Sequence, residues 1–165
     1  MKDYNISTIG RCSSVIQIKE NEICYSQSTN NSICFFDLNQ KKTKSSLNNI
    51  SKKNSEYEKF IMINKDLLLI PGQNNMTIIN VNNYIIERII DVNGSGWISG
   101  VCMLNENILL AGDYNEIIKE WKIEKNNLIL ISQKEKAHQR DISYLIKIGD
   151  GHIASASDDK TIKVW

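Results

Sequence analysis

The chain has 165 residues and a formal net charge of +1, from 20 Lys and Arg residues against 19 Asp and Glu residues. A chain this balanced has no overall field to hold nucleic acid or an anionic membrane surface. Its 41% hydrophobic content is enough to bury a core, so we expect a folded protein without a nucleic-acid partner.

The predicted elements are strands from the first residues onward. A lone leading strand is expected at residues 3–9. Runs of alternating hydrophobicity predict the first strand of each of four later units: 15–18, 60–63, 98–104 and 142–148. Further apolar or mixed runs at 84–90 and 128–132 predict an additional strand in two of these units.

A 13-residue window follows each of the four alternating runs. The windows align without gaps and cover residues 24–36, 69–81, 109–121 and 153–165. Each has an apolar first half, Asn or Asp at the seventh position, and Ile at the tenth. Because Asn and Asp bond their own backbone and tolerate left-handed φ, each window predicts a β-hairpin. Pro71 falls inside the second hairpin, where its missing N–H predicts irregular geometry.

Four strands at a period of about 40–45 residues are typical of a propeller blade. The segment 137–165 closely resembles one repeat of the WD-repeat β-propellers. The usual Gly-His opening of that family appears as Ala137-His138, the SxSxD turn as Ser155, Ser157 and Asp159, and the final Trp as Trp165. The three earlier units are similar only through the window positions, as degenerate repeats.

The resemblance implies an all-β fold, a WD-repeat type β-propeller with four-stranded antiparallel blades, about four of which are present. The units are expected at residues 10–50, 56–92, 97–133 and 137–165, with residues 1–9 supplying an outer strand that closes the ring. Three alternatives stay open: the chain is part of a larger propeller, it pairs with a second copy, or it closes alone.

The resemblance also implies a buried structural relay of hydrogen bonds through His138, Ser155, Asp159 and Trp165. Such a network fixes the loop that presents the binding face, and it is costly when half satisfied. The third unit departs from the pattern, with Gly94 in the His position and Ala111 in the Ser position. The second unit has Val81 in the Trp position. The alternative is catalytic work by His138 and Asp159.

Other chemistry has little support in the sequence. The four Cys residues have no CxxC spacing and lie in predicted strands, and only two His residues occur, so no metal site or disulfide framework is expected. Phosphate-binding and hydrolase motifs are absent, so we expect no cofactor, no small-molecule substrate and no enzyme. The Lys-rich segment 39–55 predicts a solvated insertion.

The compartment follows from what the sequence lacks. No apolar run approaches the ~18 residues of a membrane span, and the first ten residues lack the apolar stretch of a signal peptide. We therefore expect an intracellular protein, most simply cytoplasmic and alternatively nuclear.

The expected function is a non-catalytic scaffold that binds other proteins on the propeller rim. Alternatives are a propeller-type enzyme with a central-channel site and a purely structural segment of a larger assembly. By alignment to Asp141, the residues just before the first strands are Arg11, Glu56 and Trp97, and the neighbouring turns add further candidates. The candidate partner-binding residues are Trp97, Arg140, Asp141, Tyr114, Arg11, Glu56, Met76 and Asp158.

Overall fold

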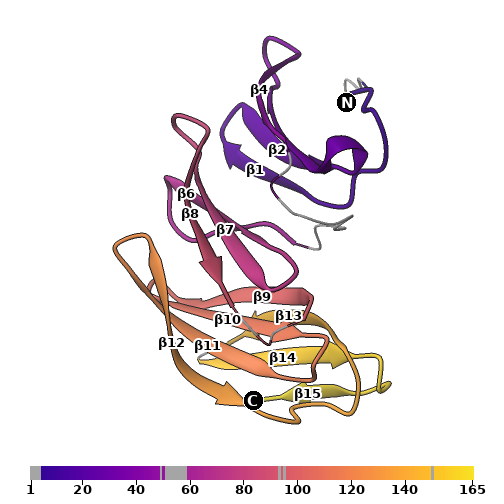
Figure 1. The fold of residues 1–165 in the computed structure, drawn as a ribbon, viewed down its shortest axis with the longest axis vertical. Helices are drawn as coiled ribbons and strands as arrows, with labels where there is room; N and C mark the ends of the chain where they lie inside the picture. The colour runs from indigo at the N-terminus through magenta and orange to yellow at the C-terminus, as the bar shows by residue number, and fades with distance from the viewer. Residues whose placement is uncertain (1–4, 49, 51–58, 93, 95, 150) are drawn as a thin grey trace.

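A computed structural model describes residues 5–48, 50, 59–92, 94, 96–149 and 151–165, and these form four antiparallel sheets that succeed one another along the chain (Figure 1). In each sheet the strands lie in sequential order, as expected for hairpin-connected blades. One short 3-10 turn, η1 (Thr29–Asn31), joins two strands of the first sheet.

The first sheet contains β1 (Val15–Lys19), β2 (Glu22–Gln27), β3 (Ser32–Asp37) and β4 (Lys42–Leu47). The second contains β5 (Ile61–Met62), β6 (Leu67–Pro71), β7 (Asn75–Asn80) and β8 (Ile85–Asp91). The third contains β9 (Ile98–Asn105), β10 (Ile108–Asp113), β11 (Ile118–Glu124) and β12 (Asn127–Lys134). The fourth contains β13 (Ile142–Ile148), β14 (His152–Ser157) and β15 (Ile162–Val164). The expected all-β architecture of repeated antiparallel sheets is confirmed.

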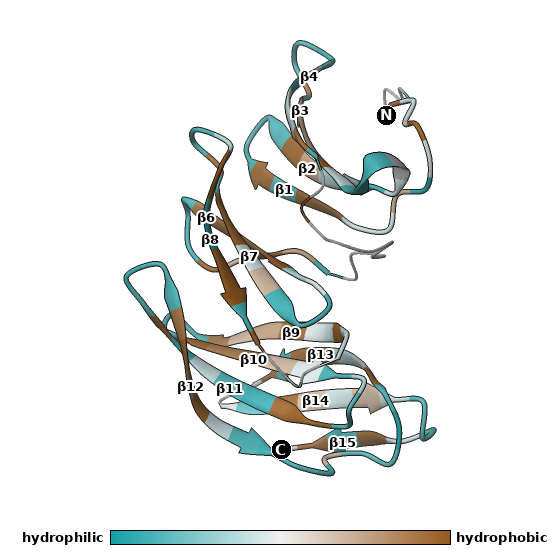
Figure 2. Cartoon of the chain, viewed as in Figure 1, coloured by the Kyte–Doolittle hydropathy of each residue, from teal (hydrophilic) through white to brown (hydrophobic). Residues whose placement is uncertain are grey.

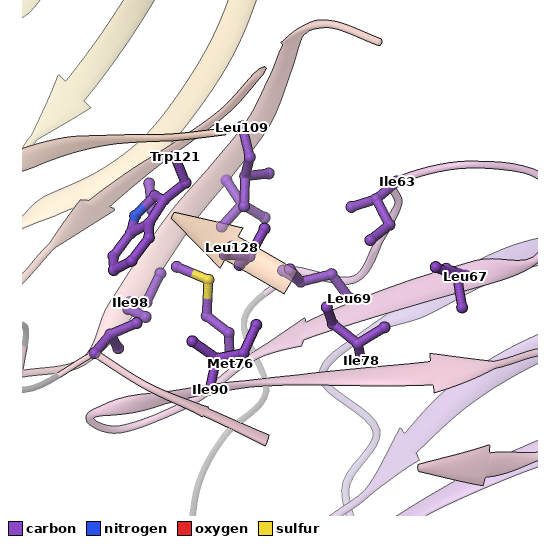
Figure 3. Packing of buried hydrophobic residues seen from close by; sticks show 13 residues of the cluster. Ile63, Leu67, Leu69, Met76, Ile78, Ile90, Ile98, Leu109, Trp121 and Leu128 are labelled. Atoms are coloured by element: carbon purple, nitrogen blue, oxygen red, sulfur yellow. The ribbon is translucent and has the colours of Figure 1, made fainter. Parts of the chain in front are cut away.

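Apolar side chains fill the spaces between successive sheets. The cluster between the second and third sheets includes Met76, Leu109 and Trp121 (Figure 3), and a second cluster around Phe35 and Leu68 joins the first and second sheets. Because the inner strand β6 is covered on both faces, it is a continuous apolar run and appears brown in Figure 2.

Three local expectations are wrong. Residues 5–9, within the expected leading strand, form no strand, and Ile6 instead packs against the cluster of Tyr25, Cys34 and Phe36. The segment 39–55 is not simply an insertion. It contains β4 (Lys42–Leu47), which pairs with β3 and completes the first sheet. Cys12 is exposed and outside any strand, whereas the other three cysteines are buried.

The first and second hairpins both differ in register from the third. In the first sheet Cys24 lies opposite Phe35 rather than Phe36. In the third sheet Trp121 lies opposite Leu109, but in the second sheet Ile78 lies opposite Leu69. The turn after β6 spans residues 72–74, one residue fewer than the turn at 114–117 after β10. Leu68 and Ile79 pair with each other and pack against the first sheet, as Leu109 and Trp121 pair and pack against the second. Ile79, and not Val81, is therefore the counterpart of Trp121, and the gapless alignment of the windows does not hold here.

Pro71 is accommodated at the end of its strand. It is the last residue of β6 and pairs with Met76, whereas β5 pairs with β6 only as far as Leu69. Because β5 does not extend alongside Pro71, no ladder bond from its missing N–H is required on that side. The second sheet is regular up to this point, at the cost of a first strand of two residues.

Candidate functional site

The fourth unit holds a chain of four polar side chains. His138 lies in the segment that enters the unit, Ser155 on β14, Asp159 in the turn after β14, and Trp165 just after β15. Trp165 Nε1 donates to Ser155 Oγ at 2.8 Å, Ser155 Oγ lies 2.7 Å from His138 Nε2, and His138 Nδ1 lies 2.8 Å from Asp159 Oδ2. The network joins the entry segment, a strand and a turn.

One arrangement of protons satisfies all of these contacts. Asp159 is an acceptor when ionised, so His138 Nδ1 carries the proton, and Nε2 accepts from the Ser155 hydroxyl. That hydroxyl oxygen in turn accepts from the Trp165 indole. The Ser–His–Asp order matches that of hydrolase triads, but Ser155 is fully buried and His138 is 1% exposed. A substrate therefore has no access to Ser155 Oγ.

Asp159 is the electrostatic anchor of this network. Burial alone would raise the pKa of its carboxyl, but hydrogen bonds from the Thr161 hydroxyl, the Gln139 backbone N–H and His138 outweigh it. The pKa of Asp159 consequently lies well below its usual range. The ionised carboxylate ties the turn after β14 to residues 138 and 139 of the entry segment.

The third unit has the same backbone register with different polar groups. Trp121 lies opposite Leu109 as Trp165 lies opposite Ile153, and Ala111 takes the place of Ser155. Among the described residues, Trp121 Nε1 and Asp113 Oδ2 are buried without a hydrogen-bond partner. Sequence reasoning missed Asp113, although an acidic residue at the end of a buried strand is itself a signal.

Asp113 is held differently from Asp159. Its Oδ1 accepts from the backbone N–H groups of Asn115 and Ile117 at 2.9 and 3.1 Å, and Lys119 Nζ lies 3.9 Å from Oδ2. Burial raises the pKa of Asp113, and these partners only partly oppose that effect. The two carboxyl groups thus have pKa values displaced in opposite directions.

A single backbone hydrogen bond recurs where a unit begins. In three units a residue of the entry segment accepts from the turn between the second and third strands: Arg11 O from Ser28 N, Trp97 O from Tyr114 N, and Asp141 O from Asp158 N, at 2.9, 2.9 and 3.1 Å. Trp97 and Asp141 directly precede the first strand of their unit, whereas Arg11 lies further ahead of β1. The entry residues therefore lie beside these turns. In Figure 1 the turns that carry them, including η1 and the β14–β15 turn, lie along the right side of the molecule.

The candidate rim residues do not all lie on this side. Arg11, Arg140 and Asp158 are exposed, Tyr114 is 39% exposed, and Asp141 is partly buried. Met76 is fully buried in the cluster between the second and third sheets, because the shorter turn places it on β7 rather than in the turn. The rim assignment of Met76 is therefore wrong. Glu56 lies outside the described residues.

Trp97 is held by backbone contacts from two units. It forms an isolated antiparallel bridge with Gln73, next to Asn74 N, which donates to Gly96 O at 2.9 Å. Its own carbonyl accepts from Tyr114. Trp97 is partly buried and belongs to none of the apolar clusters of the described residues. Its backbone lies at the junction of the second and third units.

Two asparagines organise this junction: Asn74, which sequence reasoning did not single out, and Asn115, which it placed only as a turn residue. Asn74, at a φ of 58°, accepts from Val92 N, and the equivalent carbonyl of Glu116 accepts from Ala137 N. Val92 is therefore the counterpart of Ala137, which places Gly94 one residue after the position of His138. Asn115 Nδ2 donates to Gly94 O at 2.7 Å and so replaces the bond between Asp159 and Gln139.

Two features were searched for and not found among the described residues. They contain no group of three or more His, Cys, Asp or Glu side chains placed to hold a metal ion. None of the helical segments found in this part of the chain has the length and apolarity needed to cross a bilayer.

Comparison with solved structures identifies the architecture. The chain is similar to U3-55K, a WD40 β-propeller protein, with a TM-score of 0.77 at 14% sequence identity. The match covers 93% of this chain and 48% of that chain, so this chain spans about half the length of U3-55K. At this identity the likeness shows the fold alone, a WD40-like β-propeller. No protein-family model matches the chain, and no curated protein matches it.

Proposed function

We propose that this chain is a non-catalytic interaction module that binds a peptide or domain of another protein along the side that carries Arg11, Trp97, Tyr114, Arg140, Asp141 and Asp158. The observation that carries the proposal is the repeated backbone bond between each entry residue and its turn. It ties three different side chains, Arg11, Trp97 and Asp141, to the neighbouring turn by an equivalent backbone bond in the first, third and fourth units. A side-chain set that varies on a constant backbone is suited to recognition.

The chemical character of these side chains also suits a protein partner. Trp, Tyr and Arg are the residue types most often found as interface hot spots, because they combine a large contact area with polar groups. Trp97 and Tyr114 are adjacent through their backbone bond, and Arg140 lies beside Ser157, whose hydroxyl donates to the Arg140 carbonyl. The partner is therefore expected to offer an apolar residue and an acidic group.

The buried relay has a supporting role in this proposal. His138 and Asp159 hold residues 138–139, which directly precede Arg140 and Asp141. The burial of Ser155 and His138 argues against the alternative of a hydrolytic enzyme at this position. We also propose an intracellular setting, which the four free cysteines favour.

The test is quantitative capture of partners from an extract of the source cells, with the chain as bait. Trp97→Ala and Arg140→Glu should each weaken capture of a wild-type partner by more than about 1 kcal/mol, with an unchanged melting temperature. Arg88→Glu, on the outer strand β8, is the matched charge-reversal control and should leave capture unchanged. A partner that is lost equally with Arg88→Glu, or retained by both rim variants, contradicts the proposal.

A further inference from the structure

The outer strands of the first three sheets share one irregularity. Each contains a residue that is skipped in the pairing with its neighbour, which is a β-bulge. The skipped residue is Lys44 in β4, Glu87 in β8 and Ile131 in β12. Two of the three equivalent positions therefore carry a charge, and the third carries an exposed isoleucine.

The charged bulge residues protect their strands. Lys44 pairs with the carboxylate of Glu22, and Glu87 accepts from Asn80 Nδ2 at 2.9 Å. Charges on an outer strand disfavour pairing with a further strand, because a neighbour would have to desolvate them or place like charges opposite. β4 also carries Lys42, and β8 also carries Arg88, so both edges are strongly polar.

β12 lacks this protection along most of its length. Its residues from Asn127 to Gln133 are uncharged, and three consecutive apolar side chains are exposed: Ile129 at 41%, Leu130 at 43% and Ile131 at 47%. Figure 2 shows this stretch as brown at the outer margin of the third sheet. β12 pairs with β11 on one side only, so its other edge presents unpaired backbone groups. A long, uncharged, apolar outer edge is a template for strand addition.

We propose that the edge of β12 is a self-association site, at which β12 of a second copy of this chain pairs in antiparallel orientation. With Ile129 of one copy opposite Ile129 of the other, Leu128 lies opposite Leu130 and Asn127 opposite Ile131. Lys134, the single charged residue of β12, then lies beyond the start of the partner strand at Asn127. No like charges meet along the paired stretch.

A second copy fits this edge better than a charged partner strand. An uncharged edge has no opposite charge to compensate for the desolvation of charged side chains on a partner strand. Two identical edges instead bury the same apolar residues and satisfy each other's backbone groups. The paired stretch of five residues is short, so the interface is small and the dimer is expected to be weak and concentration-dependent. The site is distinct from the turn-bearing side proposed above and does not depend on it.

The experiment is sedimentation equilibrium of the whole chain over a wide concentration range. The wild-type chain should dimerise reversibly, and Ile129→Lys should raise the dissociation constant at least tenfold, because two lysines would lie directly opposite. Ile129→Glu should do the same. An equimolar mixture of these two variants should recover a dimer, since the opposed residues then carry opposite charges.

Ile146→Lys is the matched control, because Ile146 is a β13 residue with the same 47% exposure as Ile131. It should leave the dimer unchanged, as should Trp97→Ala, and circular dichroism should show that every variant is folded. The proposal is overturned by a wild-type chain that stays monomeric, by a dimer that Ile129→Lys leaves intact, or by one that only Ile146→Lys disrupts. It is also overturned if the mixture of the Lys and Glu variants stays monomeric.

Discussion

The third and fourth units place different chemistry on the same backbone. In the fourth, Trp165, Ser155, His138 and Asp159 form a continuous set of hydrogen bonds. In the third, the indole of Trp121 packs among apolar side chains with its N–H unpartnered (Figure 3). The comparison shows that the two units share a strand register without sharing the polar network: in the third unit the aromatic ring at this position has packing contacts only.

The two units are also expected to respond oppositely to pH. A carboxyl whose pKa is lowered by folding contributes stability that is present above its unfolded pKa and is lost as pH falls. A carboxyl whose pKa is raised by folding does the reverse, so its cost is greatest when it is ionised. Asp159 belongs to the first class and Asp113 to the second. The comparison can therefore be tested by mutation and by titration.

The largest effect is expected from Ser155→Ala. The change removes the acceptor of the Trp165 indole and the partner of His138 Nε2, so buried polar groups are left unsatisfied. We expect a loss of about 1–3 kcal/mol in the free energy of unfolding, measured by urea denaturation. Ser143→Ala, at an exposed residue of β13, is the control and should cost less than about 0.5 kcal/mol. Equal losses for the two variants would show that the network contributes nothing.

The second effect is an acid transition that depends on Asp159. Because folding lowers the pKa of Asp159, the wild-type free energy of unfolding should fall as pH drops below about 4. Asp159→Asn should be less stable at neutral pH and should flatten this dependence. The measurement is urea denaturation at a series of pH values. The control is Asp158→Asn, which changes the exposed neighbouring residue. If the free energy of unfolding of Asp159→Asn still falls with acid as it does in the wild type, the lowered pKa of Asp159 is contradicted.

A smaller effect is expected from Asp113→Asn. The amide oxygen can still accept from Asn115 and Ile117, and the substitution removes a buried charge whose pKa is raised. Loss of the ion pair with Lys119 opposes this gain, so we expect a net change below about 1 kcal/mol at neutral pH. Relative to wild type, the variant should gain stability as pH rises above about 4. A loss as large as that of Ser155→Ala would remove the contrast between the units.

The smallest effect is expected from Ala111→Ser. Ala111 occupies the register position of Ser155, so the new hydroxyl can accept from the unpartnered Trp121 indole. We expect a gain of about 0.5 kcal/mol, the lower end of what one hydrogen bond contributes. The measurement is thermal denaturation of Ala111→Ser and of a control, Ala154→Ser, at a partly buried position of β14. The control distinguishes this hydrogen bond from a general effect of serine. A clear destabilisation would show that the two Trp side chains are not equivalently placed.

Particular residues show why some features were predictable from the sequence. The strand Ile142–Ile148 matches its expected bounds, because alternation and turn residues are local signals. The resemblance of the fourth unit to a WD repeat likewise implied His138, Ser155, Asp159 and Trp165 as a group. β4 was missed because its polar sequence has the composition of a loop, and only its pairing with β3 makes it a strand.

The repeat period, the turn residues and the closely matched last repeat are enough to derive an all-β propeller architecture, because each depends on residues close together in the chain. The tertiary structure decided which face each side chain occupies. Removing one residue from the second turn shifts the pairing of β6 with β7, and Met76 becomes part of the core instead of the rim. It also decided the fate of the polar groups. Whether an indole N–H finds an acceptor depends on a residue of another strand, as Ser155 and Ala111 show, and pairing across strands is a property of the fold.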